Sequence, residues 1–351
     1  MTFEEIYAVD TSNMYNLIKS FPAQVRDAVA IGKAANVKIN TRGIENIVVS
    51  GLGGSAIGGD LLRSYLAAEL KIPFLVNRTY TLPGFVGPRS LVILSSYSGD
   101  TEETIAAFRE AIKRKARVMC ISSGGMLSRL AKAKRRPLIR VPGGLPPRVA
   151  LGYSFFPLLV TFIKLGIVKN KNREIAEAIG ILEEKAGLYG NPDPQTSQPL
   201  RLAEQLHGRL GVVYSSSDRF DSVNTRWRGQ VAENAKSLAF GHVLPEMNHN
   251  ELVGWKVLQE QMREMHVIFL RDKDDHKRVQ LRMDITKKVL AEYTARMTEV
   301  WSEGTSRLTR MFSLVYFGDW TSYYLAILNG VDPTPVHVIT YLKNELSKVK
   351  A

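Results

Sequence analysis

The chain has 351 residues, which is enough for two domains of ordinary size or for two halves that share one core. Its hydrophobic content of 45% and charged content of 23% are typical of a soluble globular protein, and no segment reaches the ~20 consecutive apolar residues of a membrane helix. The N-terminal residues lack the basic and apolar regions of a signal peptide, so we expect a cytoplasmic protein that has no membrane partner.

The single cysteine and the net charge of +13 limit the chemistry further. Cys120 has no second thiol to pair with, which excludes a disulfide framework and a thiolate metal cluster, and its strand-like surroundings predict a buried core thiol. The positive charge favours anionic partners. The basic runs at 113–117 and 132–136 carry no interleaved aromatic residues and no nucleic-acid motif, so we interpret them as solvated helix surfaces and expect no nucleic-acid partner. A phosphorylated small molecule satisfies the same electrostatics.

The first half of the chain has the pattern of a parallel sheet covered by helices. Residues 1–40 are expected to form a helical leader, because their apolar side chains recur at helical spacing. From Ile44 to Val141, short apolar runs alternate with longer amphipathic ones, which is typical of parallel strands with helices on both faces. An unusually apolar helix at 153–167 and a helix at 172–185 complete a first subdomain, residues 41–186.

Residues 187–199, with three prolines, are the predicted linker, and residues 200–351 form a second subdomain that repeats the first in outline. Its expected elements, in chain order, are strand 210–214, helix 225–238, strand 267–270, helix 279–296, a strand at Val300, helix 308–328 and a last helix at 338–348. The sequence therefore predicts an α/β fold of two subdomains, each a mostly parallel sheet flanked by helices.

A glycine-rich turn follows the first predicted strand. The run Gly51-Leu-Gly-Gly-Ser-Ala-Ile-Gly-Gly59 leaves the carboxyl end of that strand and enters a helix. Free backbone N–H groups and the positive end of the helix dipole meet at such a point, which suits a phosphate group. Gly54 lets the backbone come close to this ligand, and Ser55 adds a hydroxyl group.

The same turn also fits a dinucleotide-binding fingerprint. Gly51, Gly53 and Ala56 match G-x-G-x-x-[G/A], a motif that expects an acidic residue about 20 positions later, at the end of the next strand. That strand ends here in Asn77 and Arg78. The missing acid argues against NAD and leaves an NADP-dependent oxidoreductase as a weaker alternative.

Four hydroxyl side chains gather where a later strand ends, at Ser95, Ser96, Ser98 and Thr101. The sequence Thr-Glu-Glu-Thr then opens a helix, with Asp100 or Thr101 as its N-cap residue. Capping needs one hydroxyl group, whereas four converge here with the free N–H groups of a helix terminus. The segment therefore predicts an anion-binding site that contains no P-loop lysine.

The two loops at 51–60 and 95–101 resemble the pair of sugar-phosphate loops of the sugar isomerase (SIS) fold. From about Ile44 to the last helix, the chain more specifically resembles the bifunctional phosphoglucose/phosphomannose isomerases, a family built from two such subdomains. The resemblance implies an enzyme that interconverts glucose 6-phosphate and mannose 6-phosphate with fructose 6-phosphate through a cis-enediol intermediate. It also implies that the substrate phosphate is bound by Gly54, Ser55, Ser96, Ser98 and Thr101.

Other active-site segments of the family have counterparts along the chain. They imply that the catalytic residues are Arg148 in Pro146–Tyr153, Glu233 in Glu-Asn-Ala-Lys236, His249 in Pro245–Asn250 and, on a weaker match, Lys343 in Tyr341–Leu346. The family usually has an asparagine immediately before the glutamate, whereas this chain has Ala232. This departure leaves Glu233 in place and removes a polar neighbour.

The residue types fit the steps of an aldose–ketose isomerisation. A carboxylate can move the proton between C2 and C1, so Glu233 is the implied base. A histidine can pass a proton between the ring oxygen and a hydroxyl group, so His249 is assigned to ring opening, which Lys343 assists. Arg148 supplies positive charge where the enediolate develops. On composition alone, Lys343 would be interpreted as a solvated lysine on a charged terminal helix.

The resemblance further implies no cofactor, no metal ion and a homodimer with active sites at the interface, across which His249 is supplied. His242, His249 and Glu251 are close in sequence but make no standard zinc spacing. Tolerance of both C2 epimers goes with a threonine in the C-terminal region of the family, for which Thr334 is a candidate. Besides the weaker NADP-dependent oxidoreductase, two alternatives stay open, a regulatory protein that binds sugar phosphates and an isomerase of another phosphosugar.

Overall fold

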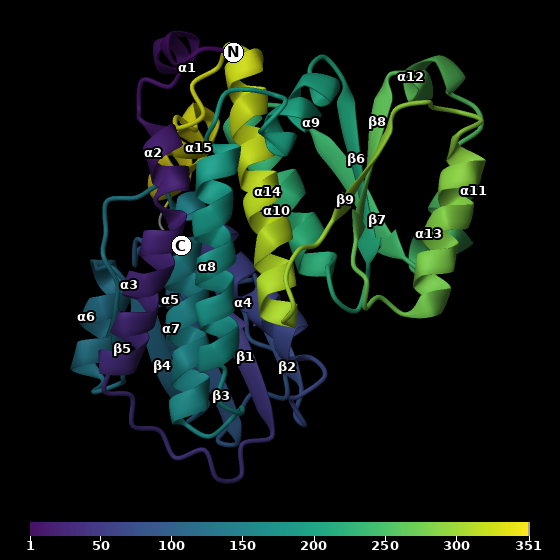
Figure 1. The fold of residues 1–351 in the computed structure, drawn as a ribbon. Helices are drawn as coiled ribbons and strands as arrows, with labels where there is room; N and C mark the ends of the chain where they lie inside the picture. The colour runs from purple at the N-terminus through teal and green to yellow at the C-terminus, as the bar shows by residue number, and fades with distance from the viewer. Residues whose placement is uncertain (350–351) are drawn as a thin grey trace.

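The computed structural model describes residues 1–349, in which the strands form two separate parallel sheets (Figure 1). The strands of the first sheet are β1 (Asn46–Ser50), β2 (Phe74–Asn77), β3 (Ser90–Ser95), β4 (Arg117–Ser122) and β5 (Leu138–Arg140). Those of the second sheet are β6 (Leu210–Ser216), β7 (Ala239–Leu244), β8 (Met265–Arg271) and β9 (Met297–Trp301). The predicted α/β fold with two parallel sheets is confirmed.

Both sheets reverse their strand order at the first strand. The orders are β2-β1-β3-β4-β5 and β7-β6-β8-β9, so β1 and β6 each lie between the next two strands of their sheet. The connections that leave such a strand diverge to its two sides, which opens a crevice at the carboxyl ends of the strands. In the first sheet this crevice lies between β1 and β3, where the glycine and serine loops begin.

Helices cover both sheets and fill the space between them (Figure 1). They are α1 (Phe3–Val9), α2 (Met14–Lys19), α3 (Phe21–Ala34), α4 (Gly53–Leu66), α5 (Glu102–Lys113), α6 (Gly125–Ala133), α7 (Leu151–Lys164), α8 (Asn172–Tyr189), α9 (Gln198–Leu206), α10 (Asp221–Ala235), α11 (Glu251–Gly254), α12 (Gln259–Arg263), α13 (Lys277–Leu290), α14 (Arg307–Leu328) and α15 (His337–Ser347). Within residues 1–349, no helix has the length and apolar character that a membrane crossing requires.

Two helices are buried on nearly every side. In α14 every residue from Leu308 to Ile327 is buried, and in α7 every residue from Leu151 to Phe162 is buried. A helix that is apolar around its whole circumference belongs inside a protein, which explains the unusual composition of these two segments. Helix α14 packs on α8, α9 and α10, and α7 packs on α3 and α4, so the two helices bring both halves of the chain together.

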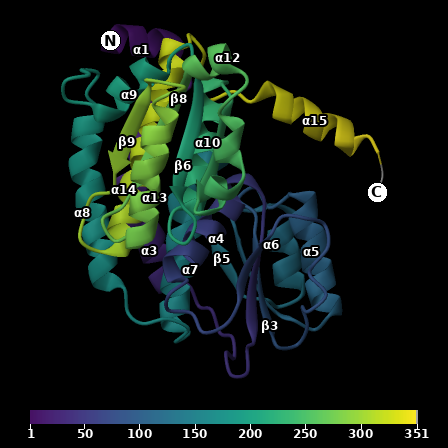
Figure 2. The ribbon, with the colours of Figure 1, turned by 90° about the vertical axis from the view of Figure 1, so that its right-hand side faces the viewer.

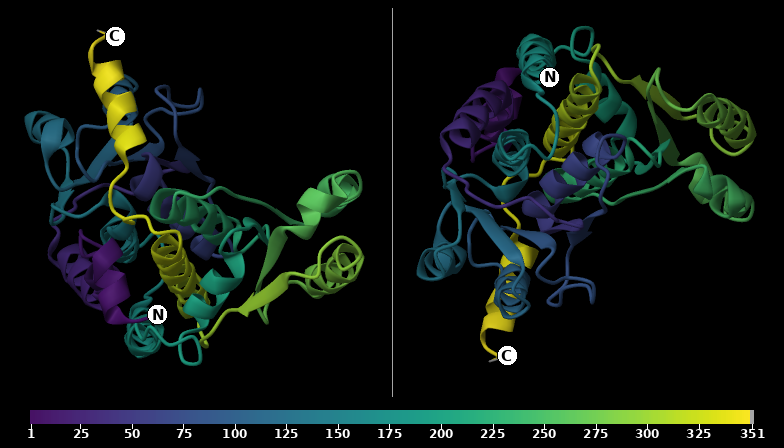
Figure 3. Two further views of the ribbon diagram at one scale, coloured as in Figure 1. Left: turned by 90° about the horizontal axis from the view of Figure 1, so that it is seen from above. Right: turned by 90° about the horizontal axis from the view of Figure 1, so that it is seen from below.

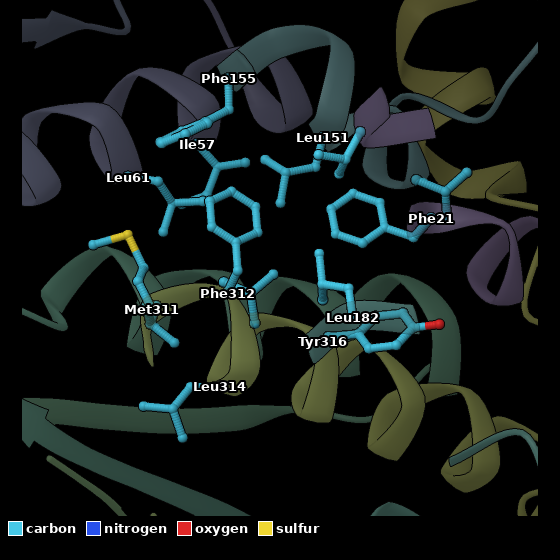
Figure 4. Close-up of a cluster of buried hydrophobic side chains, with 14 of the residues drawn as sticks. Phe21, Ile57, Leu61, Leu151, Phe155, Leu182, Met311, Phe312, Leu314 and Tyr316 are labelled. Carbon is cyan, nitrogen blue, oxygen red and sulfur yellow. The ribbon is translucent and has the colours of Figure 1, made fainter. Parts of the chain in front are cut away.

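One hydrophobic core therefore spans both halves. The ring of Phe312 in α14 lies 4.9 Å, between centroids, from Phe155 and from Phe156 of α7. Phe21 of α3 is stacked 6.2 Å from the same ring. Figure 4 shows Phe312 pointing from α14 toward Phe155 and Ile57 of the first half. The relative position of the two sheets thus depends on aromatic packing around Phe312.

We expect Phe312→Ala to lower the free energy of unfolding by about 3–5 kcal/mol, because it leaves a cavity in this shared core. Denaturant-induced unfolding followed by circular dichroism measures the change. The control Phe85→Ala removes a ring that is 57% exposed, and we expect it to cost less than about 1 kcal/mol. Equal losses in the two variants would contradict the central role of Phe312 in the core.

Some elements differ from the sequence predictions. Strand β7 was not predicted, because it is a half-exposed edge strand without a continuous apolar run. Helix α10 ends at Ala235 rather than at Leu238, since Lys236 adopts a left-handed backbone conformation with φ of 54°. The helix expected at 279–296 ends at Leu290, and the expected helical leader, residues 1–40, contains the helices α1, α2 and α3. Between α8 and α9, the predicted linker leaves residues 190–197 outside a helix.

The C-terminal helix α15 extends away from the rest of the chain (Figures 2 and 3). None of its residues is buried. Its apolar and aromatic side chains include Val338, Tyr341 and Leu342, each more than half exposed. Because an amphipathic helix normally buries its apolar face, α15 lacks a packing partner within residues 1–349.

Candidate active site

The glycine turn between β1 and α4 is built for close approach of backbone segments. A Cβ atom on Gly51 would lie 2.6 Å from the carbonyl oxygen of Ser95, and one on Gly54 would lie 2.3 Å from that of Pro147. Gly53 has a positive φ of 51°, which favours glycine. The backbone N–H groups of Gly53 and Gly54 have no acceptor within residues 1–349, so they are available to an anion at the start of α4.

Ser55 joins this turn to the serine loop. Its Oγ accepts a hydrogen bond from the backbone N–H of Tyr97 at 3.0 Å, so the hydroxyl proton is left to donate elsewhere. The phenolic oxygen of Tyr97 accepts a bond from the N–H of Leu145 at 3.1 Å, and Ser154 Oγ donates to the carbonyl of Gly54 at 3.1 Å. The two loops and the segment before α7 therefore form one connected structure.

The serine loop ends at the N-terminus of α5. Ser96 Oγ lies 2.8 Å from Thr101 Oγ1 and accepts from the N–H of Gly99 at 3.1 Å, and Ser98 Oγ accepts from the N–H of Asp100 at 3.3 Å. The N-cap residue of α5 is Thr101, and its side chain makes no capping bond. The carboxylate of Asp100 instead accepts from Met126 N–H at 2.8 Å. The first turn of α5 therefore keeps free N–H groups beside two hydroxyl groups.

Arg148 lies in a short 3-10 helix, Pro147–Val149, and is only 3% exposed. Its Nε donates to Asn234 Oδ1 at 2.6 Å, and its Nη2 donates to the carbonyls of Pro333 and Thr334 at 2.6 and 2.8 Å. Its Nη1 lies 3.7 Å from a carboxylate oxygen of Glu233. One side of the guanidinium group is thus occupied by protein acceptors, and Nη1 can reach a ligand next to Glu233.

Glu233 is near the end of α10, and its side chain is 34% exposed. Lys236 Nζ donates to the carbonyl of Glu233 at 2.6 Å. Burial lowers the pKa of Arg148, and the carboxylates of Glu233 and Asp332 oppose this shift. The pKa of Lys236 is also lowered, by burial and then by Arg148. Two cations and two carboxylates therefore share a partly desolvated region, where electrostatic interactions are stronger than in water.

A buried polar stripe on α10 holds this arrangement in place. Arg226 donates to both carboxylate oxygens of Asp319 on α14, at 3.0 and 2.7 Å, and to the carbonyl of Arg148 at 3.0 Å. Asn234, which accepts from Arg148, donates in turn to Ser322 Oγ at 3.0 Å. The sequence interpretation did not include Arg226 or Asn234. The sequence feature that could have identified them is the spacing of polar residues at 226, 230 and 234, which places them on one face of a predicted helix.

His249 and Lys343 do not join the site in a single chain. Helix α10 runs back along the second sheet, so Glu233 lies near the end where β7 begins, whereas His249 follows the end where β7 finishes. Strand β7, whose six residues span about 20 Å, lies between the two positions along the chain. His249 and Lys343 are both exposed, the latter on α15. Within one chain, the structure brings Arg148 close to Glu233 and to Gly54, and Ser55 joins the two loops.

Ala232, which replaces the asparagine that the family usually has, is exposed beside Glu233. Arg78, the residue behind the NADP alternative, forms a salt bridge with Asp60 of α4. This pairing counts against a free arginine for a 2′-phosphate. Within residues 1–349, no three His, Cys, Asp or Glu side chains are grouped so that they could hold a metal ion.

Comparisons with known proteins agree with the fold. A family model described as the bacterial phospho-glucose isomerase C-terminal SIS domain matches residues 195–346. A bifunctional phosphoglucose/phosphomannose isomerase from Caldicellulosiruptor bescii is 41% identical over 338 residues, which are 96% of this chain and 100% of that protein. One from Aquifex aeolicus is 39% identical over 306 residues, or 87% of this chain and 91% of that protein.

A solved structure of a glucose-6-phosphate isomerase-like protein from Thermus thermophilus has the same fold, with a TM-score of 0.64 at 19% identity over 96% of this chain and 98% of that one. The matches to the curated relatives extend over both sheets and contain the segments of Arg148 and Glu233. The identity and coverage of these matches show common descent along nearly the whole chain. The chain therefore belongs to the bifunctional phosphoglucose/phosphomannose isomerase family.

Proposed function

We propose that the chain is an aldose–ketose isomerase that converts glucose 6-phosphate and mannose 6-phosphate into fructose 6-phosphate and back. The observation that carries this proposal is the buried Arg148, whose Nη1 lies 3.7 Å from the carboxylate of Glu233. The backbone of Arg148 packs against Gly54, at the start of α4. In this proposal the start of α4 holds the phosphate, Arg148 supplies the positive charge, and Glu233 is the carboxylate base. Family membership supports the same chemistry.

The phosphate needs only to be bound, and two helix N-termini serve this purpose. Free N–H groups and helix dipoles at α4 and α5 attract an anion, and the surrounding hydroxyl groups donate to its oxygens. The proposed phosphate ligands are Gly54, Ser55, Ser96, Ser98 and Thr101. Binding energy at this remote group holds the sugar carbons in place for the reaction.

The proton transfer is assigned to Glu233. Its carboxylate removes the proton from C2 of the open-chain aldose and returns it to C1, through a cis-enediol that both hexose epimers share. Arg148 Nη1 lies on the same side as this carboxylate and can donate to the oxygen that becomes negative. In this scheme the two aldoses form the same enediol, and they differ only in the face of C2 from which the proton is removed.

The role proposed for His249 in ring opening calls for a second copy of the chain, because Glu233 lies near the start of β7 whereas His249 follows its end. We propose a homodimer in which one subunit supplies His249 to the Glu233 site of its partner, and in which Lys343 of the exposed α15 is also brought to a substrate. The surface next to His249 is apolar and open, with Val253 76%, Val257 84% and Leu258 59% exposed. Exposed apolar side chains of this kind mark an interaction surface.

A coupled assay of the purified chain with glucose 6-phosphate and with mannose 6-phosphate, in the presence and absence of a chelator, tests the proposal. We expect both sugars to be converted, and the rate to be unchanged by the chelator. Binding of fructose 6-phosphate without conversion would favour a regulatory protein instead. Turnover of a different phosphosugar alone would change the substrate and keep the reaction class.

The phosphate loops carry a separate prediction. We expect Ser96→Ala combined with Thr101→Ala to raise KM about 10²–10⁴-fold with little change in kcat, since each of the two lost hydrogen bonds to a charged group costs about 1.5–3 kcal/mol. Thr101 makes no capping bond, so α5 keeps its N-terminus. Steady-state kinetics measure the change, with Ser128→Ala on α6 as the control. An unaltered KM would remove this loop from the phosphate site.

A further inference from the structure

The residues Asp332–Thr334, called the strap below, connect α14 to the exposed helix α15. The carbonyls of Pro333 and Thr334 both accept hydrogen bonds from Arg148 Nη2, at 2.6 and 2.8 Å. Lys236 Nζ donates to the carbonyl of Pro333 as well, at 3.2 Å. The orientation of the Arg148 guanidinium group therefore depends on how the strap itself is held.

Asp332 holds the strap in its conformation. Its Oδ1 accepts from the backbone N–H of Thr334 at 2.8 Å, which closes a local turn. Its Oδ2 accepts from the hydroxyl groups of Thr11 and Ser12, at 2.5 and 3.1 Å. These two residues belong to the N-terminal leader, more than 300 positions away in the sequence. Burial opposes ionisation of Asp332, but the hydrogen bonds that it accepts outweigh burial and lower its pKa.

Hydrogen bonds of Asp10 attach the leader to the core next to Thr11 and Ser12. Asp10 is 4% exposed and accepts from the backbone N–H groups of Met14 and Tyr15, at 2.8 and 2.7 Å. Tyr323 of α14 donates to the same carboxylate at 3.0 Å. The turn that presents Thr11 and Ser12 is thus attached to the central helix of the core. On its other side the strap continues into α15, which has no packing partner within residues 1–349.

We propose that Asp332 is a positioning residue for Arg148, and that Thr11 and Ser12 of the leader act through it. By fixing the strap, these side chains keep the Nη2 side of the guanidinium group occupied, so that Nη1 stays beside Glu233. The N-terminal leader is then a functional part of the active site although none of its residues reaches the substrate. This inference rests on the proposed function, because it assigns Arg148 to the enediolate.

The test removes the two hydroxyl groups and leaves Asp332 in place. In the double variant Thr11→Val and Ser12→Ala, we expect kcat to fall at least about tenfold, because small displacements of a catalytic group are costly. KM should stay within about twofold of its original value, since the phosphate loops are untouched. Thr11→Ser keeps the hydroxyl group and should retain the original kcat.

A control within the leader separates positioning from simple folding. Thr2 accepts from the N–H of Glu5 and caps α1, and it makes no contact with the strap. Thr2→Val should therefore leave kcat unchanged. An equal loss of kcat in Thr2→Val and in the double variant would overturn the proposal, because any weakening of the leader would then be sufficient. Unchanged kcat in the double variant would overturn it as well.

A binding measurement makes the result independent of turnover. Gluconate 6-phosphate carries a carboxylate at C1, where Arg148 would meet it, whereas glucitol 6-phosphate carries an uncharged alcohol there. Isothermal titration should show that the double variant binds the carboxylate compound roughly tenfold more weakly and the alcohol equally well. Equal effects on both compounds would overturn the positioning role. If the double variant shows this difference in binding but the original chain does not isomerise hexose phosphates, the positioning role holds and only the proposed function fails.

Discussion

Replacing Glu233 with glutamine is expected to reduce kcat by about 10²–10⁴-fold while the affinity for fructose 6-phosphate stays within about twofold. Glutamine has nearly the same shape as glutamate and can still form hydrogen bonds, but it cannot accept the C2 proton. The phosphate loops at α4 and α5 lie outside the substituted residue, so the bound sugar keeps its anchor. The loss should therefore appear in kcat and not in binding.

Two measurements separate these effects. A coupled assay gives kcat, and isothermal titration with fructose 6-phosphate gives the dissociation constant. Glu292→Gln, an exposed residue beyond the end of α13, is the matched control and should behave like the original chain. Turnover comparable to that control would remove Glu233 from the role of base. A parallel loss of binding would show that the substitution disturbs the Arg148 site, whose Nη1 lies 3.7 Å from this carboxylate.

The parts of the site that could be predicted from sequence are local ones. Gly51 to Ser55 and Ser95 to Thr101 are short segments in which a strand end, a turn and a helix start follow each other, so their chemistry can be read without knowing the rest of the fold. The parallel arrangement of the sheets followed from the alternation of strands and helices. Both features depend on interactions between residues near in sequence.

The proximity of Arg148 and Glu233 has a different origin, and spacing alone could not reveal it. It depends on Arg226 and Asp319, which join α10 to α14, and on Asn234, which connects Arg148 to the same helix. These contacts join residues 93 and 86 positions apart. The family resemblance named the two residues, but only the packing of α10 on α14 accounts for their distance.

For His249, the sequence identified the segment but not its position relative to Glu233. Its segment was identified from the sequence, yet the strand that separates it from Glu233 was not. Strand β7 is half-exposed at the edge of its sheet, so its residues show neither a buried run nor a regular alternation. Strand β7, whose six residues span about 20 Å, runs along one edge of the sheet from its amino end, near Glu233, to its carboxyl end, after which His249 follows. We therefore propose that a site with both side chains draws them from two subunits.

Shared sites make a strong prediction about mixtures of inactive variants. We expect Glu233→Gln and His249→Asn to be nearly inactive when each is assayed alone, because every site in either homodimer lacks one of the two side chains. When the two proteins are unfolded together and refolded, about half of the dimers contain one chain of each kind. One of the two sites in such a dimer has an intact Glu233 and an intact His249. The mixture should therefore recover about a quarter of the original activity.

The control for this recovery mixes two variants whose substituted residues are supplied to each site by the same chain. Arg148 and Glu233 come from one chain, 3.7 Å apart at their closest atoms, so Glu233→Gln mixed with Arg148→Lys leaves one defect in every site of every dimer. That mixture should stay inactive. Recovery in both mixtures would point to exchange of whole domains, and recovery in neither would mean that each chain completes its own site. Only recovery confined to the His249 mixture fits a histidine that crosses the interface, since the length of β7 keeps it from the Glu233 of its own chain.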